Sequence, residues 1–201
     1  MSKYFIIGTD TNIGKTYTCI KLLKYFNKQG LKTIGIKPVA TGCLNGLNDD
    51  ALLLQQHSSI KLDYSLINPF AFAPAVSPNI ACNDLTSNKI WDSLKDTLKT
   101  EADIYIIEGV GGFLAPISNK ETMADLMIKF KDIEIILVIG IRLGCLNHTL
   151  LTYQAIVSRN IKIKGWIANI IDPSMEAIDE NISTIKNYIQ EPCLKVIPYD
   201  N

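Results

Sequence analysis

The chain has 201 residues, of which 47% are hydrophobic and 20% are charged, and its 20 basic and 20 acidic residues give a formal net charge of zero. This profile is typical of a folded globular protein and excludes an intrinsically disordered one. The length favours one domain over residues 1–201. Because the chain contains no run of Lys or Arg, neither nucleic acid nor an anionic membrane is an expected partner.

Apolar patterning and cysteine spacing indicate a cytoplasmic protein. The longest apolar run, Ile135–Ile139, is too short to cross a bilayer. Tyr4–Ile7 leads directly into a glycine-containing loop, so it is expected to be a first strand rather than part of a signal peptide. Five scattered cysteines, none in C-x-x-C spacing, favour reduced thiols over disulfides or a zinc site.

Strand-like and helix-like segments alternate along the chain. Strands are expected at Lys3–Gly8, Leu31–Lys37, Asp103–Ile107, Ile135–Ile141, Lys164–Ile171 and Leu194–Ile197. Helical spacing marks a helix from about Lys15 towards Gly30, a run over Asp50–Gln56, and the sets Trp91/Leu94/Leu98, Leu146/Leu150/Tyr153/Val157 and Ile178/Ile182/Ile185/Ile189. Continuous apolar strands suit a sheet buried on both faces. We therefore predict an α/β fold with a doubly wound, mostly parallel sheet and helices on both faces.

A phosphate-binding loop is the most specific motif. Gly8–Thr16 reads GTDTNIGKT, follows a predicted strand and opens a predicted helix. In such a P-loop the backbone N–H groups and the helix N-terminus hold phosphate oxygens. Lys15 is expected to reach the β- and γ-phosphates, and the Thr16 hydroxyl to ligate Mg²⁺. The loop has five residues between its glycines where the usual pattern has four, and a plain glycine turn is the alternative.

Three further residues are candidates for the same site. Glu108 precedes Gly-Val-Gly-Gly at the end of a predicted strand, and Asp50 opens a predicted helix. Both are candidate Mg²⁺ ligands, with helix capping as the alternative for each. Lys37 ends an apolar strand, where its ammonium is expected to meet an anion unless it reaches solvent.

A long segment and a late turn complete the candidate regions. Asn68–Asn83 contains three prolines and little periodicity, and is expected to be a long functional loop. Arg142–His148 reads as a strand-to-helix turn and a plausible binding edge, whereas His57 is assigned no role.

Taken together, these segments resemble the dethiobiotin synthetase family. The resemblance covers nearly the whole chain, and the longer phosphate loop belongs to the family's pattern. It rests on GTDTNIGKT (8–16), GIKPVATG (35–42), NDDALLL (48–54), NPFAFAPAVSPN (68–79), EGVGG (108–112), RLGCLNH (142–148) and GWIAN (165–169).

The resemblance implies an ATP- and Mg²⁺-dependent ligase of biotin biosynthesis. In that family 7,8-diaminononanoate takes up CO₂ as a carbamate, which attacks the γ-phosphate of ATP. The second amine closes on the carbamic-phosphoric anhydride, giving the cyclic urea dethiobiotin, ADP and phosphate. The resemblance also implies a homodimer with its sites at the interface.

The resemblance assigns roles residue by residue. Lys37, Lys15 and Thr11 are the implied catalytic residues, and Thr16, Asp50 and Glu108 the implied metal site. The implied nucleotide contacts are Asn12, Ile13, Gly14, Lys15, Thr16, Tyr17, Asp50, Glu108, Gly109, Val110, Gly111 and Asn169, the last against the base. The implied substrate contacts are Thr41, Ser77 and Gly112, with Gly111 beside it, together with Leu143, Gly144 and Asn147, which hold the substrate carboxylate from the partner subunit.

The chain departs from the family at two places. Asn12 stands where members often carry an acid, and few residues follow the last predicted strand, which predicts a poorly built base pocket and weak discrimination between ATP and GTP. One alternative function is a P-loop ATPase switch of the partitioning type, although such proteins usually have a second lysine, which is missing between Gly8 and Gly14. Another is an amide-forming synthetase of corrinoid pathways, which usually requires an additional glutaminase domain.

Overall fold

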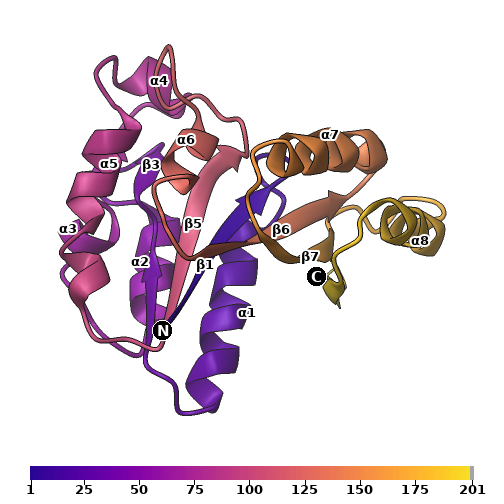
Figure 1. Ribbon diagram of the computed structural model, residues 1–201, viewed down its shortest axis with the longest axis horizontal. Helices are drawn as coiled ribbons and strands as arrows, with labels where there is room; N and C mark the ends of the chain where they lie inside the picture. The colour runs from indigo at the N-terminus through magenta and orange to yellow at the C-terminus, as the bar shows by residue number, and fades with distance from the viewer. Residues whose placement is uncertain (200–201) are drawn as a thin grey trace.

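Six parallel strands form the central sheet of the computed structural model, which describes residues 1–199 (Figure 1). Their order across the sheet is β2-β5-β1-β6-β7-β8. In chain order they are β1 (Ser2–Gly8), β2 (Thr33–Ile36), β5 (Ile104–Gly112), β6 (Ile133–Ile141), β7 (Ile163–Ile170) and β8 (Cys193–Ile197). A second, two-stranded parallel sheet pairs β3 (Val39–Thr41) with β4 (Phe70–Phe72).

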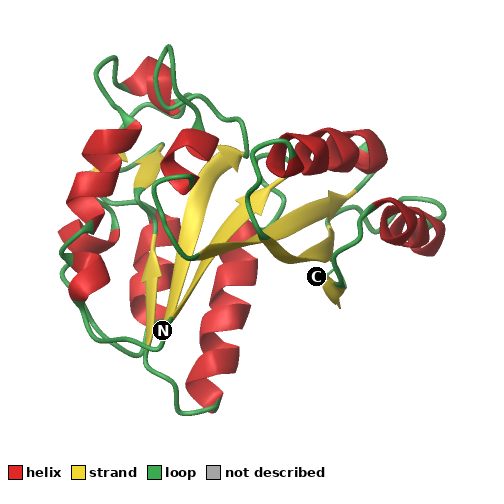
Figure 2. Ribbon diagram, viewed as in Figure 1, coloured by secondary structure: helices red, strands yellow, loops and turns green. Residues whose placement is uncertain are grey.

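Helices cover both faces of the main sheet (Figure 2). The helices are α1 (Lys15–Lys28), α2 (Asp49–His57), α3 (Tyr64–Ile67), α4 (Pro78–Ala81), α5 (Ser87–Leu94), the short 3₁₀ helix η1 (Thr97–Lys99), α6 (Met123–Met127), α7 (Cys145–Val157) and α8 (Ile178–Tyr188). This arrangement confirms the predicted doubly wound α/β fold.

The two faces bury different sets of strand residues because side chains alternate along each strand. On one face Ile6 packs in a core with Leu23 of α1 and Leu54 of α2. On the other face Phe5 and Ile7 belong to a larger core built with residues of α5, α6, α7 and α8. The strands therefore bury both faces, which explains their continuous apolar sequence.

Most predicted elements are confirmed, and the differences have physical reasons. The second strand is shorter than Leu31–Lys37, because β2 pairs with β5 only from Thr33 to Ile36. The predicted strand Asp103–Ile107 is longer than expected, because β5 continues over Glu108 and the following glycines to Gly112, which pairs with Gly8 of β1 after a break in register. Gly111 takes a left-handed φ of 62° at this irregularity, a conformation that glycine adopts without strain.

Three other expectations are corrected. The segment Asn68–Asn83 is not a plain loop, because it contains β4 and α4. Helix α5 ends at Leu94, and Leu98 lies in η1. Val157 does not line the inner face of α7; it is exposed, and the helix buries Cys145, Thr149 and Ile156. Within residues 1–199, no helix is both long and apolar enough to cross a membrane.

Candidate active site

The carboxyl ends of the parallel strands meet at one edge of the sheet, where ligands of open α/β sheets bind. A cleft of about 420 Å³ lies there. It is lined by Thr11, Asn12, Gly14, Lys15, Thr16, Lys37, Thr41, Asn48, Asp50, Glu108, Gly109, Val110 and Gly111. The structure thus brings together thirteen residues from five separate segments. Twelve of them, all except Asn48, were predicted site residues.

The phosphate loop joins β1 to α1. Gly14 takes a left-handed φ of 85° at the N-terminus of α1, where a Cβ atom would lie 2.1 Å from the Asn169 amide nitrogen. Asn12 is also left-handed, with φ of 56°, and Asn tolerates this conformation better than most residues. This backbone requirement gives a physical reason for Asn at position 12.

Lys15 is buried at the start of α1, where its Nζ donates to the Asp10 carbonyl oxygen over 2.7 Å. Burial disfavours the ammonium form and lowers the pKa of Lys15 to about 8, with Lys37 lowering it further and Glu108 opposing the shift. A triphosphate in the cleft would supply the anion that this ammonium lacks.

Lys37 lies directly after β2 and is 5% exposed. Its Nζ donates to Glu108 Oε1 over 2.7 Å and to Asp50 Oδ2 over 2.5 Å. Burial alone would lower the pKa of Lys37, but the two carboxylates outweigh burial and raise it above its ordinary value. The lysine is therefore a buried cation held between two acids, and it does not reach solvent.

Glu108 and Thr16 meet across the cleft. The Thr16 hydroxyl donates to Glu108 Oε1 over 2.8 Å. Glu108 is 1% exposed, and its Oε2 atom is buried without a hydrogen-bond partner among the described residues. A buried carboxylate oxygen without a donor is expensive, and a hard cation such as Mg²⁺ would satisfy it.

Asp50 comes from the first turn of α2. Burial would raise its pKa, but the charge of the Lys37 ammonium and its hydrogen bond to Oδ2 hold the pKa of this carboxyl below its usual value. Asn48 caps the helix, its Oδ1 accepting the Ala51 N–H over 3.2 Å, and it also lines the cleft. Asn48 was not predicted to line the cleft, although an Asn before a helical run is a recognisable N-cap signal.

Several residues implied by the family resemblance lie outside the cleft lining. Ile13 is 1% exposed within the core, and its carbonyl oxygen accepts a hydrogen bond from the Asn169 amide over 2.8 Å. Ser77 Oγ donates to the Pro116 carbonyl over 3.3 Å. The others not among the lining residues are Tyr17, Gly112, Leu143, Gly144, Asn147 and Asn169. Asp200 and Asn201, on which the expectation about the base pocket partly rested, lie outside the described residues.

An ion pair ties the phosphate loop to the turn after β6. Arg142 Nη2 donates to Asp10 Oδ2 over 2.5 Å, and Asp10 Oδ1 accepts the Thr11 N–H over 2.7 Å. Neither Asp10 nor Arg142 was assigned a role from the sequence. Their pairing depends on the neighbouring positions of β1 and β6, which local sequence patterns do not reveal.

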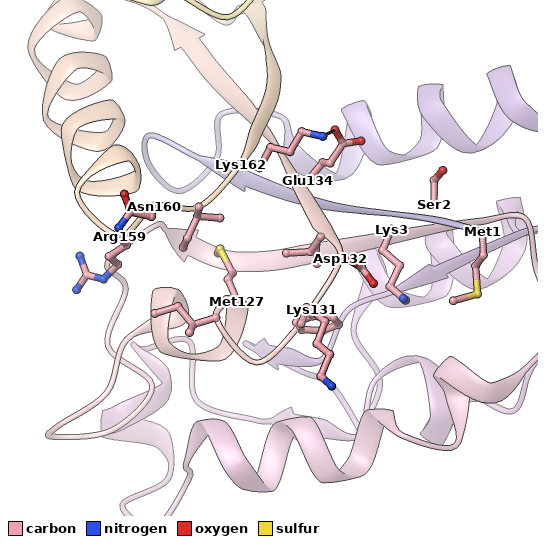
Figure 3. A pocket seen from close by; sticks show the side chains of 14 residues that line it. Met1, Ser2, Lys3, Met127, Lys131, Asp132, Glu134, Arg159, Asn160 and Lys162 are labelled. Atoms are coloured by element: carbon pink, nitrogen blue, oxygen red, sulfur yellow. Dashed lines mark ion pairs between the residues drawn. The ribbon is translucent and has the colours of Figure 1, made fainter.

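A second cavity, of about 460 Å³, opens at the opposite end of the sheet (Figure 3). It is lined by the amino ends of β1 and β6 and by the turn before β7, and Lys162 pairs with Glu134 there over 2.9 Å. Although slightly larger, it lacks the phosphate loop and the buried Lys37–Glu108 pair. The cleft at the carboxyl ends is therefore the candidate functional site.

Comparison with known proteins agrees with this geometry. A family model described as an AAA domain matches residues 2–201. Proteins named ATP-dependent dethiobiotin synthetase BioD are similar over almost the whole chain: one from Pseudomonas aeruginosa is 38% identical (98% of this chain, 90% of the relative), one from Pseudoalteromonas translucida 39% (99% and 91%), and one from Nitrosospira multiformis 40% (98% and 88%).

Solved structures support the fold at lower identity. The MinC:MinD cell division complex from Aquifex aeolicus matches with a TM-score of 0.63 at 14% identity, covering 100% of this chain and 82% of that one. A ParA family ATPase from Chlorobium tepidum matches with a TM-score of 0.58 at 14% identity, covering 100% and 85%. These likenesses show a common fold, and the partitioning-type alternative has weaker support than the full-length similarity near 38–40%. The chain belongs to the ATP-dependent dethiobiotin synthetase family.

Proposed function

We propose that the chain joins CO₂ to 7,8-diaminononanoate at the expense of ATP, giving dethiobiotin, ADP and phosphate. The observation that carries the proposal is the convergence of Lys15, Thr16, Lys37, Asp50 and Glu108 in one cleft at the mouth of a phosphate loop. The names of the full-length relatives supply the substrate class.

The reaction needs positioning and charge neutralisation more than a covalent protein nucleophile. One amine adds to CO₂ and loses a proton, forming a carbamate. A carbamate oxygen attacks the γ-phosphorus, and ADP leaves. The second amine then attacks the carbamate carbon and loses a proton, the C–O bond to phosphate breaks, and the five-membered urea closes.

The two buried lysines are suited to the negative charges of the triphosphate and the carbamate in this reaction. Lys15 would hold the β- and γ-phosphates, since among residues 1–199 its ammonium has only a backbone carbonyl as hydrogen-bond partner. Lys37 carries a fixed positive charge between Glu108 and Asp50, and would face both the carbamate and the transferring phosphoryl group. Thr11 and Thr41, which line the cleft, would contact the diamine or its carbamate.

The donor set fits Mg²⁺. Thr16, Asp50 and Glu108 offer hard oxygen ligands, and Glu108 Oε2 has no donor among the described residues. When bound, the ion would neutralise charge on the triphosphate. The test is a Mg²⁺ titration: Glu108→Gln and Asp50→Asn should each require a higher Mg²⁺ concentration for half-maximal activity. An unchanged titration would remove that residue from the metal site.

We also infer a homodimer whose interface completes each site. Leu143 is 90% exposed, and Leu151 is exposed one helical turn beyond Asn147 on α7. These apolar side chains suit burial against a second copy of the chain, with Leu143, Gly144 and Asn147 holding the substrate carboxylate in the partner's cleft. The free thiols of all five cysteines suit a cytoplasmic enzyme.

Product analysis tests the proposed function directly. Incubation with ATP, Mg²⁺, bicarbonate and the diamine should yield dethiobiotin and ADP in equal amounts. The Lys37→Ala variant is the matched control, and omission of the diamine should abolish ADP release. Release of ADP at the same rate without the diamine would instead favour the partitioning-type ATPase.

A further inference from the structure

The hydroxyl of Tyr64, the first residue of α3, connects two segments that carry site residues. It accepts a hydrogen bond from the Asn48 backbone N–H over 2.8 Å and donates one to Asn68 Oδ1 over 2.9 Å. Asn48 is the N-cap of α2, two residues before Asp50. Asn68 follows α3 and is 3% exposed. One hydroxyl group therefore joins the start of α2 to the end of α3.

Asn68 in turn contacts the backbone of Lys37. Its Nδ2 donates to the Lys37 carbonyl oxygen over 2.6 Å, and the Lys37 N–H donates to the Ile67 carbonyl over 3.0 Å. Both backbone polar groups of Lys37 are thus engaged by two consecutive residues, Ile67 and Asn68. The α3 segment holds Lys37 from its main chain, while Glu108 and Asp50 hold its ammonium.

Strand pairing in the main sheet does not hold the backbone of Lys37. The pairing of β2 with β5 ends at Ile36 and Ile107, one residue before Lys37. The next residue is Pro38, which has no backbone N–H to donate. The position of Lys37 beyond the strand end is therefore set by the contacts from Ile67 and Asn68.

We propose that Tyr64 and Asn68 are positioning residues: the Tyr64 hydroxyl fixes the N-terminus of α2 and hence Asp50, and the Asn68 amide fixes the backbone of Lys37. This inference rests on the proposed roles of Lys37 and Asp50. Neither Tyr64 nor Asn68 lines the cleft, so both act through the residues that do. The distance between the Lys37 ammonium and the Asp50 carboxylate therefore depends on one continuous set of hydrogen bonds through Asn48, Tyr64 and Asn68.

Two variants test the two parts of this hydrogen-bond network, the contact of Tyr64 with Asn48 and the contact of Asn68 with Lys37. Tyr64→Phe keeps the ring but removes the bond to the Asn48 N–H, and leaves the Asn68 amide able to donate to Lys37. Asn68→Leu approximately keeps the side-chain shape but removes the donor to the Lys37 carbonyl and the acceptor of the Tyr64 hydroxyl, and leaves that hydroxyl able to accept from the Asn48 N–H. Because displacing a catalytic group by about 1 Å can cost on the order of a hundredfold in rate, even a small shift is measurable.

Tyr105→Phe is the matched control. The Tyr105 hydroxyl also has backbone partners, the carbonyl oxygens of Thr100 and Thr97. Its removal is the same chemical change as in Tyr64→Phe and should likewise lower stability. Tyr105 lies near the amino end of β5, away from the cleft lining. A purely structural role of Tyr64 would therefore make Tyr64→Phe and Tyr105→Phe behave alike.

The experiment measures kcat, the KM for ATP, the Mg²⁺ concentration for half-maximal activity and the Tm of each variant. Tyr64→Phe should raise the Mg²⁺ requirement severalfold, and Asn68→Leu should lower kcat on the order of ten- to a hundredfold with a smaller effect on Mg²⁺. Tyr105→Phe should lower the Tm but leave kcat and the Mg²⁺ requirement at wild-type values. If Asn68→Leu does not fold, Tyr64→Phe alone carries the test.

Wild-type kcat and Mg²⁺ dependence in Tyr64→Phe, with a Tm loss like that of Tyr105→Phe, would overturn the inference. Lys37→Ala and Asp50→Asn are measured in parallel. If these two variants are impaired while Tyr64→Phe and Asn68→Leu are not, only the positioning role is wrong. If Lys37→Ala and Asp50→Asn keep full activity, the roles proposed for Lys37 and Asp50 are wrong, and the positioning inference falls with them.

Discussion

Lys37 illustrates how a charge is kept in an apolar strand end. Its ammonium lies between a buried carboxylate, Glu108, and a half-exposed one, Asp50. Breaking a buried ion pair by removing one partner leaves an uncompensated charge, which usually costs more than replacing both partners. Stability and catalysis therefore depend on the same side chains and can be separated by the choice of substitutions.

Lys37→Met should lower kcat by roughly a hundredfold or more, the scale of losing one preorganised electrostatic donor. It should also lower the free energy of unfolding by about 3 kcal/mol, because Glu108 loses its buried counter-charge. The double variant Lys37→Met/Glu108→Gln should recover much of that stability and none of the activity. Urea denaturation with steady-state kinetics measures both; recovery of activity in the double variant would contradict the role of Lys37.

Lys15 predicts a pH dependence of nucleotide binding. Its pKa is lowered to about 8, mainly by burial, and an adjacent triphosphate would favour the charged form. Above pH 8 ATP binding must therefore take up a proton, so the affinity should fall by up to about tenfold per pH unit as pH rises towards 10. Calorimetric titration at several pH values measures this fall.

Lys15→Arg is the control for that prediction, because its guanidinium stays charged throughout the range. Its ATP affinity, whatever its absolute value, should not show the same decline. The effect of Lys15 on folding stability has the opposite dependence on pH from its effect on ATP affinity. Between about 8 and the unfolded value of 10.5 the unfolded chain binds more protons at Lys15, so this residue makes folding more favourable as pH rises. Parallel declines in ATP affinity for both proteins would assign the titration to another group.

At the scale of elements, α7 presents residues that its own cleft does not use. Asn147 lies in its first turn and is exposed, and it is not among the lining residues of the described cleft. If Asn147 serves the partner's site, a dimer of Lys37→Ala with Asn147→Ala contains one site with both defects and one intact site.

Mixing the two inactive variants should therefore restore activity. Random exchange makes half of the dimers hybrids with one working site of two, so recovery should approach roughly a quarter of the wild-type rate. Mass spectrometry of differently tagged subunits verifies the exchange. Verified exchange without recovery would place Asn147 in its own subunit's site or outside any site.

The elements themselves were predictable in proportion to their length and burial. The runs at Ile104–Ile107 and Ile135–Ile139 have continuous apolar sequence because both faces are covered, and both lie in strands. The three-residue strands β3 and β4 leave too short a pattern to recognise. The extension of β5 over Gly109–Gly112 was missed because glycines predict a turn, whereas β1 offers a strand partner there.

The candidate site was predictable where one segment carries the chemistry. The phosphate loop identified Lys15 and Thr16 by their spacing, and strand ends indicated Lys37 and Glu108. Tyr64 and Asn68 were not identified, because their significance lies in contacts with the distant Asn48 and with Lys37. Such a network depends on how α2, α3 and β2 pack, which local patterns do not specify.

At the scale of the whole molecule, the sheet places β1 between β5 and β6. The strands that pair with β1 begin at Ile104 and Ile133. The segments on either side of the phosphate loop are therefore far from it in the sequence. Glu108, the carboxylate that meets both Lys37 and Thr16, belongs to the nearer of these partners.

This order has a consequence during translation. A ribosome adds about 5–20 residues per second, so β1 must wait on the order of ten seconds before β5 has emerged beside it. Through that interval Phe5, Ile6 and Ile7 lack the cover they have in the finished sheet, and the phosphate loop lacks Glu108. The carboxylate that meets Lys37 and Thr16 therefore joins the phosphate loop only after β5 has been synthesised, and β1 gains its second neighbour only when β6 follows.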